Sequence, residues 1–224
     1  PDRGPIRIAW DEYNVWYRAR TGAARQGTRA LEEHYNLEDA LVVAGFLNAF
    51  VRNADIVKMA NMAQLVNVIA PIFTNEKTLY KQTIYYPLQL FAQHVYGQAL
   101  DVYVACETYD TERFPIGLGE TTTIQKAVPY LDVSAAYNKG DLVICVLNRH
   151  KDKAMTTDIA CQEGQFAGPF KVIEVSGPDV KAENDFGKEP VKTVQRPDVN
   201  ASGKAMTYSF PPHSFTLMKG TVKR

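Results

Sequence analysis

An apolar run that ends in two carboxylates constrains the fold of this chain more than any other stretch. Residues 6–16 read Ile-Arg-Ile-Ala-Trp-Asp-Glu-Tyr-Asn-Val-Trp, and Gly4-Pro5 precedes them. A short run of β-formers bounded by turn residues predicts a buried strand, and polar side chains follow where it ends. If the strand belongs to a parallel α/β barrel, these side chains lie at the catalytic end, because barrel active sites form at the carboxyl ends of the strands.

Strand alternation makes Glu12 a candidate catalytic carboxylate. Every second residue from Ile6 through Trp10 to Glu12 points to one side, which would be the barrel interior, and Glu12 emerges at its mouth. A bulge would change that register, and a carboxylate after a strand more often serves a turn or a helix cap than catalysis. The neighbouring rings of Trp10, Tyr13 and Trp16 favour a sugar subsite, although such residues also fill ordinary cores.

Charge and cysteine content bound the function of the chain. Its 224 residues carry 25 basic and 25 acidic side chains, so no electrostatic footprint for nucleic acid or an anionic membrane is expected. No apolar run reaches the roughly 18 residues of a membrane helix. The chain has three widely spaced cysteines without metal-ligand spacing: Cys106, Cys145 and Cys161. We expect them to be small core residues in a reducing, cytoplasmic environment, and a single disulfide between two of them is the alternative.

The first part of the chain predicts two strand–helix units. Asn36 is a good N-cap, with Asp39 as a capping-box acid, for a helix that ends at residue 52. A strand is expected at residues 56–59, and a second helix at residues 87–96 with Gly97 as its stop. The long connection at residues 17–33 holds Arg18 and Arg20, which either meet substrate or are solvated.

Three amides follow the second predicted strand. Asn61, Gln64 and Asn67 lie among apolar residues, and buried amides need hydrogen-bond partners. We expect internal partners for Asn61 and Asn67, whereas for Gln64 an internal partner and a ligand are equally good interpretations.

From residue 99 onward the pattern changes to short alternating runs separated by turns, which predicts an antiparallel β-sandwich. The expected strands are residues 100–106, 130–137, 142–147, 170–175, 207–210 and 215–218. Residues 180–204 are polar and rich in turn residues, so they are predicted to form a long exposed excursion. The acidic residues Glu107, Asp110 and Glu112 follow the first of these strands, and we expect solvated charge there and not a catalytic pair.

Five blocks of the chain match the motifs of a known enzyme family. They are Asp-Glu-Tyr-Asn-Val-Trp-Tyr at 11–17, Tyr-Asn-Leu-Glu-Asp-Ala-Leu at 35–41, Ala-Gln-Leu-Val-Asn-Val-Ile-Ala-Pro-Ile at 63–72, Gln-Thr-Ile-Tyr-Tyr-Pro at 82–87 and Val-Pro-Tyr-Leu-Asp at 128–132. In these blocks the chain resembles glycoside hydrolase family 51, the α-L-arabinofuranosidases. The blocks occur in family order along nearly the whole chain, except for residues 151–204.

This resemblance implies a (β/α)8 barrel followed by a jelly-roll-like β-sandwich, and hydrolysis with retention of configuration. Within the family pattern, Glu12 corresponds to the nucleophile, Trp16 to a substrate-contacting aromatic residue and Gln64 to an amide at the sugar site. Tyr13 replaces the tryptophan that is common in the family, which keeps an aromatic surface and adds a hydroxyl. No metal or cofactor is implied.

A whole barrel needs about 250 residues, whereas residues 1–98 suffice for only two units, which the resemblance makes the last two. Residues 99–224 would form the sandwich. The acid/base carboxylate would come from an N-terminal portion of the same enzyme, so this chain alone is expected to be inactive.

The expected activity is release of terminal α-L-arabinofuranosyl residues from arabinan or arabinoxylan by a homo-oligomer, often a hexamer in this family. An endo-β-glucanase or xylanase is the alternative within the class, and a non-catalytic carbohydrate-binding module is the alternative outside it.

Overall fold

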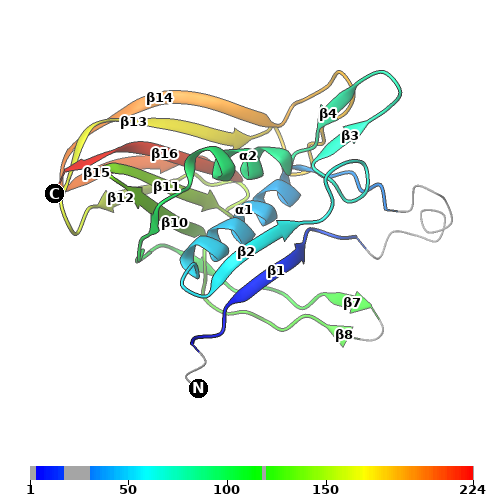
Figure 1. Ribbon diagram of the computed structural model, residues 1–224, viewed down its shortest axis with the longest axis horizontal. Coiled ribbons are helices and arrows are strands. Elements are labelled where there is room, and N and C mark those ends of the chain that lie inside the picture. Colours follow the sequence, from blue (N-terminus) through cyan, green and yellow to red (C-terminus); the bar gives the residue numbers. More distant parts are fainter. Residues whose placement is uncertain (1–3, 18–30, 118–119, 224) are drawn as a thin grey trace.

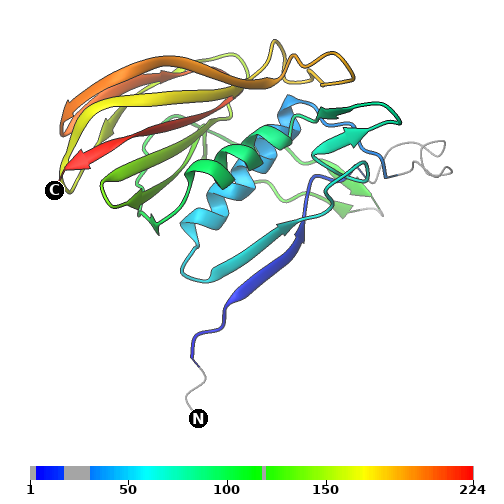
Figure 2. The same ribbon diagram turned by 45° about the horizontal axis from the view of Figure 1, so that its top comes forward.

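The computed structural model describes residues 4–17, 31–117 and 120–223 of the chain (Figure 1). Arg18 and Arg20, the two candidate substrate contacts in the long connection, lie outside the described residues. The described chain is mostly β, with one curled eight-stranded sheet and two helices. Figure 2 shows three layers: the curled sheet, the two helices, and a separate pair of strands near the N-terminus.

The N-terminal strands form a parallel unit with a connecting helix. Strand β1 (Ile8–Tyr13) pairs in parallel with β2 (Val57–Met62), and α1 (Leu37–Arg52) joins them. The predicted cap is confirmed, since Asn36 N donates to Asp39 Oδ2 at 2.8 Å and Asp39 N donates to Asn36 Oδ1 at 3.3 Å. This reciprocal pair satisfies two backbone donors that the first turn leaves without helical partners.

A small hairpin and the second helix follow β2. The hairpin consists of β3 (Ile72–Thr74) and β4 (Leu79–Lys81), and α2 spans Tyr85–His94. The predicted helix therefore exists but begins two residues earlier, which leaves Pro87 in the first turn, where a missing N–H costs no hydrogen bond. Gly97 has φ +104°, and a Cβ there would lie 2.4 Å from the carbonyl oxygen of Tyr137, so the close approach requires glycine.

The curled sheet has the strand order β12-β15-β14-β13-β16-β11-β10-β5, and every neighbouring pair is antiparallel. Its strands are β5 (Gln98–Ala99), β10 (Leu131–Asn138), β11 (Asp141–Asn148), β12 (Met155–Ala160), β13 (Gln165–Ser176), β14 (Lys192–Gly203), β15 (Ala205–Phe210) and β16 (Ser214–Lys223). An arm between β5 and β10 holds the short strands β6 (Thr108–Tyr109), β7 (Pro115–Gly117), β8 (Glu120–Thr121) and β9 (Val128–Pro129). The curled sheet agrees with the predicted sandwich.

The prediction of an exposed excursion over residues 180–204 is wrong for its second half. Strand β14 covers twelve residues there and pairs with β13 along most of its length. Most of its side chains remain exposed, so the strand shows little of the hydrophobic alternation from which sequence interpretation works. Strand β12 was not among the predicted strands either.

The predicted strand at residues 100–106 is also wrong, because β5 ends at Ala99 and the segment after it joins no strand ladder in the described structure. Its alternation is nevertheless real. Leu100, Val102 and Val104 pack half-buried against the core inside the curled sheet, while Tyr103 between them is 92% exposed. The alternating pattern therefore reflects one covered face and not strand pairing.

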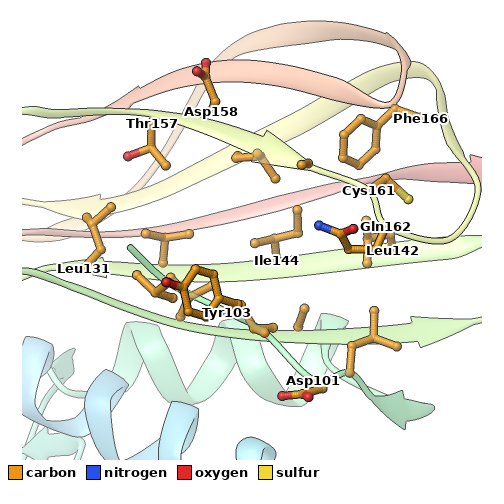
Figure 3. A pocket seen from close by; sticks show the side chains of 18 of the residues that line it. Asp101, Tyr103, Leu131, Leu142, Ile144, Thr157, Asp158, Cys161, Gln162 and Phe166 are labelled. Carbon is orange, nitrogen blue, oxygen red and sulfur yellow. The ribbon is translucent and has the colours of Figure 1, made fainter. Parts of the chain in front are cut away.

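Two hydrophobic clusters flank the curled sheet. One lies between the sheet and the helices, where Phe91 of α2 stacks on Phe215 of β16 with ring centroids 5.6 Å apart. The other fills the inside of the curl and includes Phe166 and Phe170. A cavity of about 580 Å³ opens beside the second cluster, between the segment after β5 and the edge strand β12 (Figure 3). Cys145 is buried in the first cluster, and all three cysteines are free.

Candidate functional site

The strand end that carries Glu12 does not keep a simple alternation. The ring of Trp10 lies 5.8 Å from that of Phe50 on α1, and the ring of Tyr13 lies 5.0 Å from Phe50 and 6.1 Å from Phe46. Both rings therefore face the helix, although residues three apart on a regular strand point to opposite sides. The pairing of β1 with β2 shifts register between Trp10 and Tyr13, as a bulge does. The regular alternation predicted for this strand end is therefore wrong, because it would place residues 10 and 13 on opposite sides.

Glu12 lies next to Tyr13 on this strand end, and its side chain is exposed. Tyr13 is only 9% exposed, and burial raises the pKa of its hydroxyl. Trp16 follows beyond the end of the strand and is 47% exposed.

The carboxyl end of β1 is tied to the loop after β2 by Asn14. Its Nδ2 donates to the carbonyl oxygen of Ala63 at 3.0 Å and to that of Ile69, and its Oδ1 accepts from Val15 N at 2.8 Å. Gln64 lies in this loop with an exposed side chain. The structure thus brings the strand end that carries Glu12 beside the loop that carries Gln64. Sequence interpretation did not single out Asn14, although an amide at the end of an apolar run was the available signal.

The other amides of this region have different surroundings. Asn67 is satisfied internally, as expected, because its Oδ1 accepts from Thr74 N at 2.7 Å and its Nδ2 donates to Thr74 Oγ1 at 3.1 Å. Asn61 is exposed, so the burial assumed for it is wrong.

The fully buried side-chain amide of Gln82 joins segments at the same end of the β1–α1–β2 unit. Its Oε1 accepts from Tyr35 N at 2.9 Å, and its Nε2 donates to the carbonyl oxygens of Glu33 and Ala70 at 2.9 and 2.8 Å. Tyr35, also buried, donates its hydroxyl to the carbonyl oxygen of Val15 at 2.7 Å. The segment before α1, the loop after β2 and the chain after β1 are therefore fixed to one another.

The acidic residues of the arm behave as solvated charges. Glu107 pairs with Lys153 at 2.6 Å, with both side chains more than half exposed, and this hydrogen bond lowers the pKa of Glu107. Asp110 accepts from the backbone N–H of Ala127 at 2.9 Å. Within the described ranges, no group of three or more His, Cys, Asp or Glu side chains is arranged to hold a metal ion. None of the described helices is both long and apolar enough to cross a bilayer.

The described fold, a parallel strand–helix–strand unit beside a curled antiparallel sheet, is shared with solved glycoside hydrolases. The matching family model is described as the alpha-L-arabinofuranosidase C-terminal domain and covers residues 11–214. The chain belongs to this family and corresponds to the C-terminal portion of glycoside hydrolase family 51 enzymes.

Among curated relatives, "Probable alpha-L-arabinofuranosidase C" of Aspergillus flavus is 37% identical over 220 residues, which cover 98% of this chain and 40% of the relative. "Intracellular exo-alpha-(1->5)-L-arabinofuranosidase 1" of Bacillus subtilis is 29% identical, covering 96% of this chain and 42% of the relative. The chain thus spans about 40% of the length of the curated relatives it matches. The alpha-L-arabinofuranosidase of Thermotoga maritima, solved with arabinose, superimposes with a TM-score of 0.83 at 28% identity, covering 96% of this chain and 43% of that one.

Proposed function

We propose that the full-length protein containing this chain is a retaining glycoside hydrolase that releases terminal α-L-arabinofuranosyl residues from arabinan- or arabinoxylan-type saccharides. The family match carries this proposal, together with the names of the relatives. Since the chain spans under half of those relatives, the activity belongs to the whole protein, and the isolated chain is expected to be inactive.

Residues 1–98 would form the C-terminal part of a catalytic (β/α)8 barrel and residues 99–224 a jelly-roll-like sandwich. The parallel β1–α1–β2 unit supports the first assignment. Its two strands leave apolar side chains uncovered, with Trp10 47% and Met59 54% exposed. Surface of this kind is normally covered by a partner, and the N-terminal portion of the same enzyme, which also carries the acid/base, is the partner we propose.

In the proposed mechanism, the carboxylate of Glu12 attacks the anomeric carbon while the acid/base protonates the leaving oxygen, which breaks the glycosidic bond and forms a glycosyl-enzyme. The acid/base then removes a proton from water, and the water releases the sugar from Glu12. Trp16 would pack against the sugar ring, and Gln64 would donate a hydrogen bond to the sugar or to Glu12. Tyr13, which packs on α1 and is only 9% exposed, would offer the sugar little surface.

Replacement of Glu12 by Ala in the full-length enzyme tests this assignment. Turnover of an aryl α-L-arabinofuranoside should be abolished while the melting temperature stays near that of the wild type, because Glu12 is exposed at a strand end. Added azide should restore reaction and give the glycosyl azide of inverted configuration. The substitution Asp55→Asn, on the turn before β2 at the other end of the unit, is the matched control and should leave turnover unchanged.

Two measurements would contradict the mechanism. Undiminished activity of Glu12→Ala would remove this residue from the reaction. Wild-type hydrolysis with inversion, read from the anomeric signals of the first product, would show that a carboxylate activates water instead, with a separation of about 6.5–9.5 Å between the two carboxyl groups in place of about 5–5.5 Å.

The remaining assignments have their own tests. A panel of aryl glycosides and polymer substrates separates the arabinofuranosidase from an endo-β-glucanase or xylanase, and sugar binding without turnover would favour a binding module. Light scattering of the full-length protein tests the proposed homo-oligomer, including a hexamer. A cytoplasmic location agrees with the three free cysteines and with the bacterial relative named intracellular, and fractionation of the source cells tests it.

A further inference from the structure

The loop that carries Gln64 is held at its base by one side chain of the neighbouring strand end. Asn14 Nδ2 donates to the carbonyl oxygens of Ala63 and Ile69, the two residues that flank the loop at positions 64–68. Its Oδ1 accepts from Val15 N at 2.8 Å, so both amide hydrogens and the amide oxygen are engaged. Both ends of the loop are thus fixed to the chain two residues beyond Glu12.

The conformation of Ile69 shows why the base of the loop needs this support. Its φ is +40°, in the left-handed region that β-branched residues rarely adopt. Its carbonyl oxygen accepts from Gln64 N at 3.2 Å as well as from Asn14, and its N–H donates to the carbonyl oxygen of Leu31 at 2.8 Å. A strained residue persists only where its surroundings over-determine it, and such residues cluster at functional sites.

The rest of the loop has little apolar support. Leu65 and Val66 are 66% and 42% exposed, and the hydrogen bonds of Asn67 join it to Thr74 on the far side. Little apolar surface is buried at its tip. The hydrogen bonds of Asn14, with that from Ala63 N to the carbonyl oxygen of Tyr13 at 3.3 Å, join the base of the loop to the end of β1, whereas those of Asn67 join it to β3.

We propose that Asn14 is a positioning residue, which sets the place of Gln64 relative to Glu12 and thereby controls turnover. The carbonyl oxygen of Ile69 is the direct link, because it accepts from both Asn14 and the backbone of Gln64. This inference rests on the glycosidase function proposed above. Asn14 itself needs no contact with the sugar.

A double-mutant cycle in the full-length enzyme tests the proposal. Asn14→Ala should lower kcat/KM about 100-fold, the loss that a displacement near 1 Å typically causes. If Asn14 acts through Gln64, the double variant Asn14→Ala/Gln64→Ala should be no more than a few-fold slower than the slower single variant, because no amide is then left to position. Asn67→Gly is the matched control: it removes hydrogen bonds from the same loop, tolerates the φ of +62°, and should change kcat/KM only a few-fold.

Asn14→Asp separates a loss of positioning from a loss of folding. It keeps the shape and the oxygen that accepts from Val15 N, but its carboxylate cannot donate to Ala63 or Ile69. It should therefore show a similar loss of kcat/KM. Unchanged kcat/KM in both Asn14 variants, or losses that multiply in the double variant, would overturn the proposal. Failure of both variants to fold would assign Asn14 to stability and overturn it equally.

Failure of the proposed function is read separately from failure of this inference. The cycle is measured on whichever glycoside the wild type hydrolyses fastest, so a different sugar would change the substrate and leave the coupling of Asn14 to Gln64 intact. Full activity of Glu12→Ala would reject the mechanism whatever the cycle shows.

Discussion

Asp132 fixes helix α1 to the curled sheet, and its replacement by Asn should measurably loosen this contact. Its Oδ1 accepts from Arg52 Nη1 at 2.9 Å and Asn48 Nδ2 at 2.8 Å, and its Oδ2 accepts from Arg52 Nη2 at 3.1 Å and Arg149 Nη2 at 2.7 Å. The Asp132 side chain is only 10% exposed. The substitution keeps the shape and the bond from Asn48 but removes the charge that two arginines share.

The size of the effect follows from burial. Breaking a buried ion pair by removing one partner costs about 3–5 kcal/mol. Arg52 and Arg149 are 34% and 28% exposed, so water can partly resolvate them, which places the loss near the lower end, at about 3 kcal/mol. At about 2–4 °C per kcal/mol for a domain of this size, the melting temperature should fall by roughly 6–12 °C.

The pH dependence of the loss has a definite sign. Burial raises the pKa of Asp132, but the hydrogen bond from Arg52, the charge of Arg149 and the hydrogen bond from Asn48 outweigh it, so the pKa lies below its usual value. A carboxylate whose pKa falls on folding stabilises the protein above the unfolded value of about 3.9. This stabilisation is lost as the pH falls through the folded pKa, so the gap between wild type and Asp132→Asn should close in acid.

Thermal unfolding of the full-length protein, followed across pH, checks this prediction. Glu107→Gln is the control, because it removes a charge from an ion pair of which both members are more than half exposed, and its melting temperature should not change. A fall of less than about 1 °C for Asp132→Asn, or a fall equal to that of the control, would refute the argument that burial makes this ion pair strong.

Two further predictions use the same measurement. Gly220→Ala should destabilise the protein by about 1–3 kcal/mol, because the new Cβ would lie 2.4 Å from the buried ring of Phe170. Gly45→Ala within α1 meets only ordinary contact and should stabilise it by about 0.5–1 kcal/mol. A gain in stability for Gly220→Ala, or a loss for Gly45→Ala, would contradict the packing. Gln82→Ala leaves buried groups without a hydrogen-bond partner, among them the carbonyl oxygen of Ala70, and should lower the free energy of unfolding by at least about 1–3 kcal/mol. An unchanged melting temperature would reject this prediction.

Helix α1 could be predicted from the sequence because the forces that define it are local. Asn36 and Asp39 are three residues apart, and their hydrogen bonds depend only on the first turn. Both ends of α2 differ from the prediction by two residues, since its N-cap residue Ile84 makes no side-chain cap hydrogen bond that would mark the start. Strand β14 could not be predicted, because it is held by backbone hydrogen bonds to β13 and most of its side chains face solvent.

The candidate site shows the same division between local and non-local causes. The position of Glu12 at a strand end could be read from the apolar run, because the change to polar residues is local. Which side each neighbour faces could not, because the register shift between Trp10 and Tyr13 arises from pairing with β2, more than forty residues away. The role of Asn14 depends equally on Ala63 and Ile69, which only the fold brings close.

Aromatic residues near a carboxylate are therefore a weaker sign of a sugar subsite than the sequence suggests. Trp10 and Tyr13 both pack on Phe50, so at this strand end they serve the contact between β1 and α1. Trp16 lies beyond the bulge and beyond the strand, and 47% of its surface is exposed. A residue three or four positions past a candidate nucleophile, outside the ladder, is thus a better candidate for sugar contact than an equally aromatic residue within it.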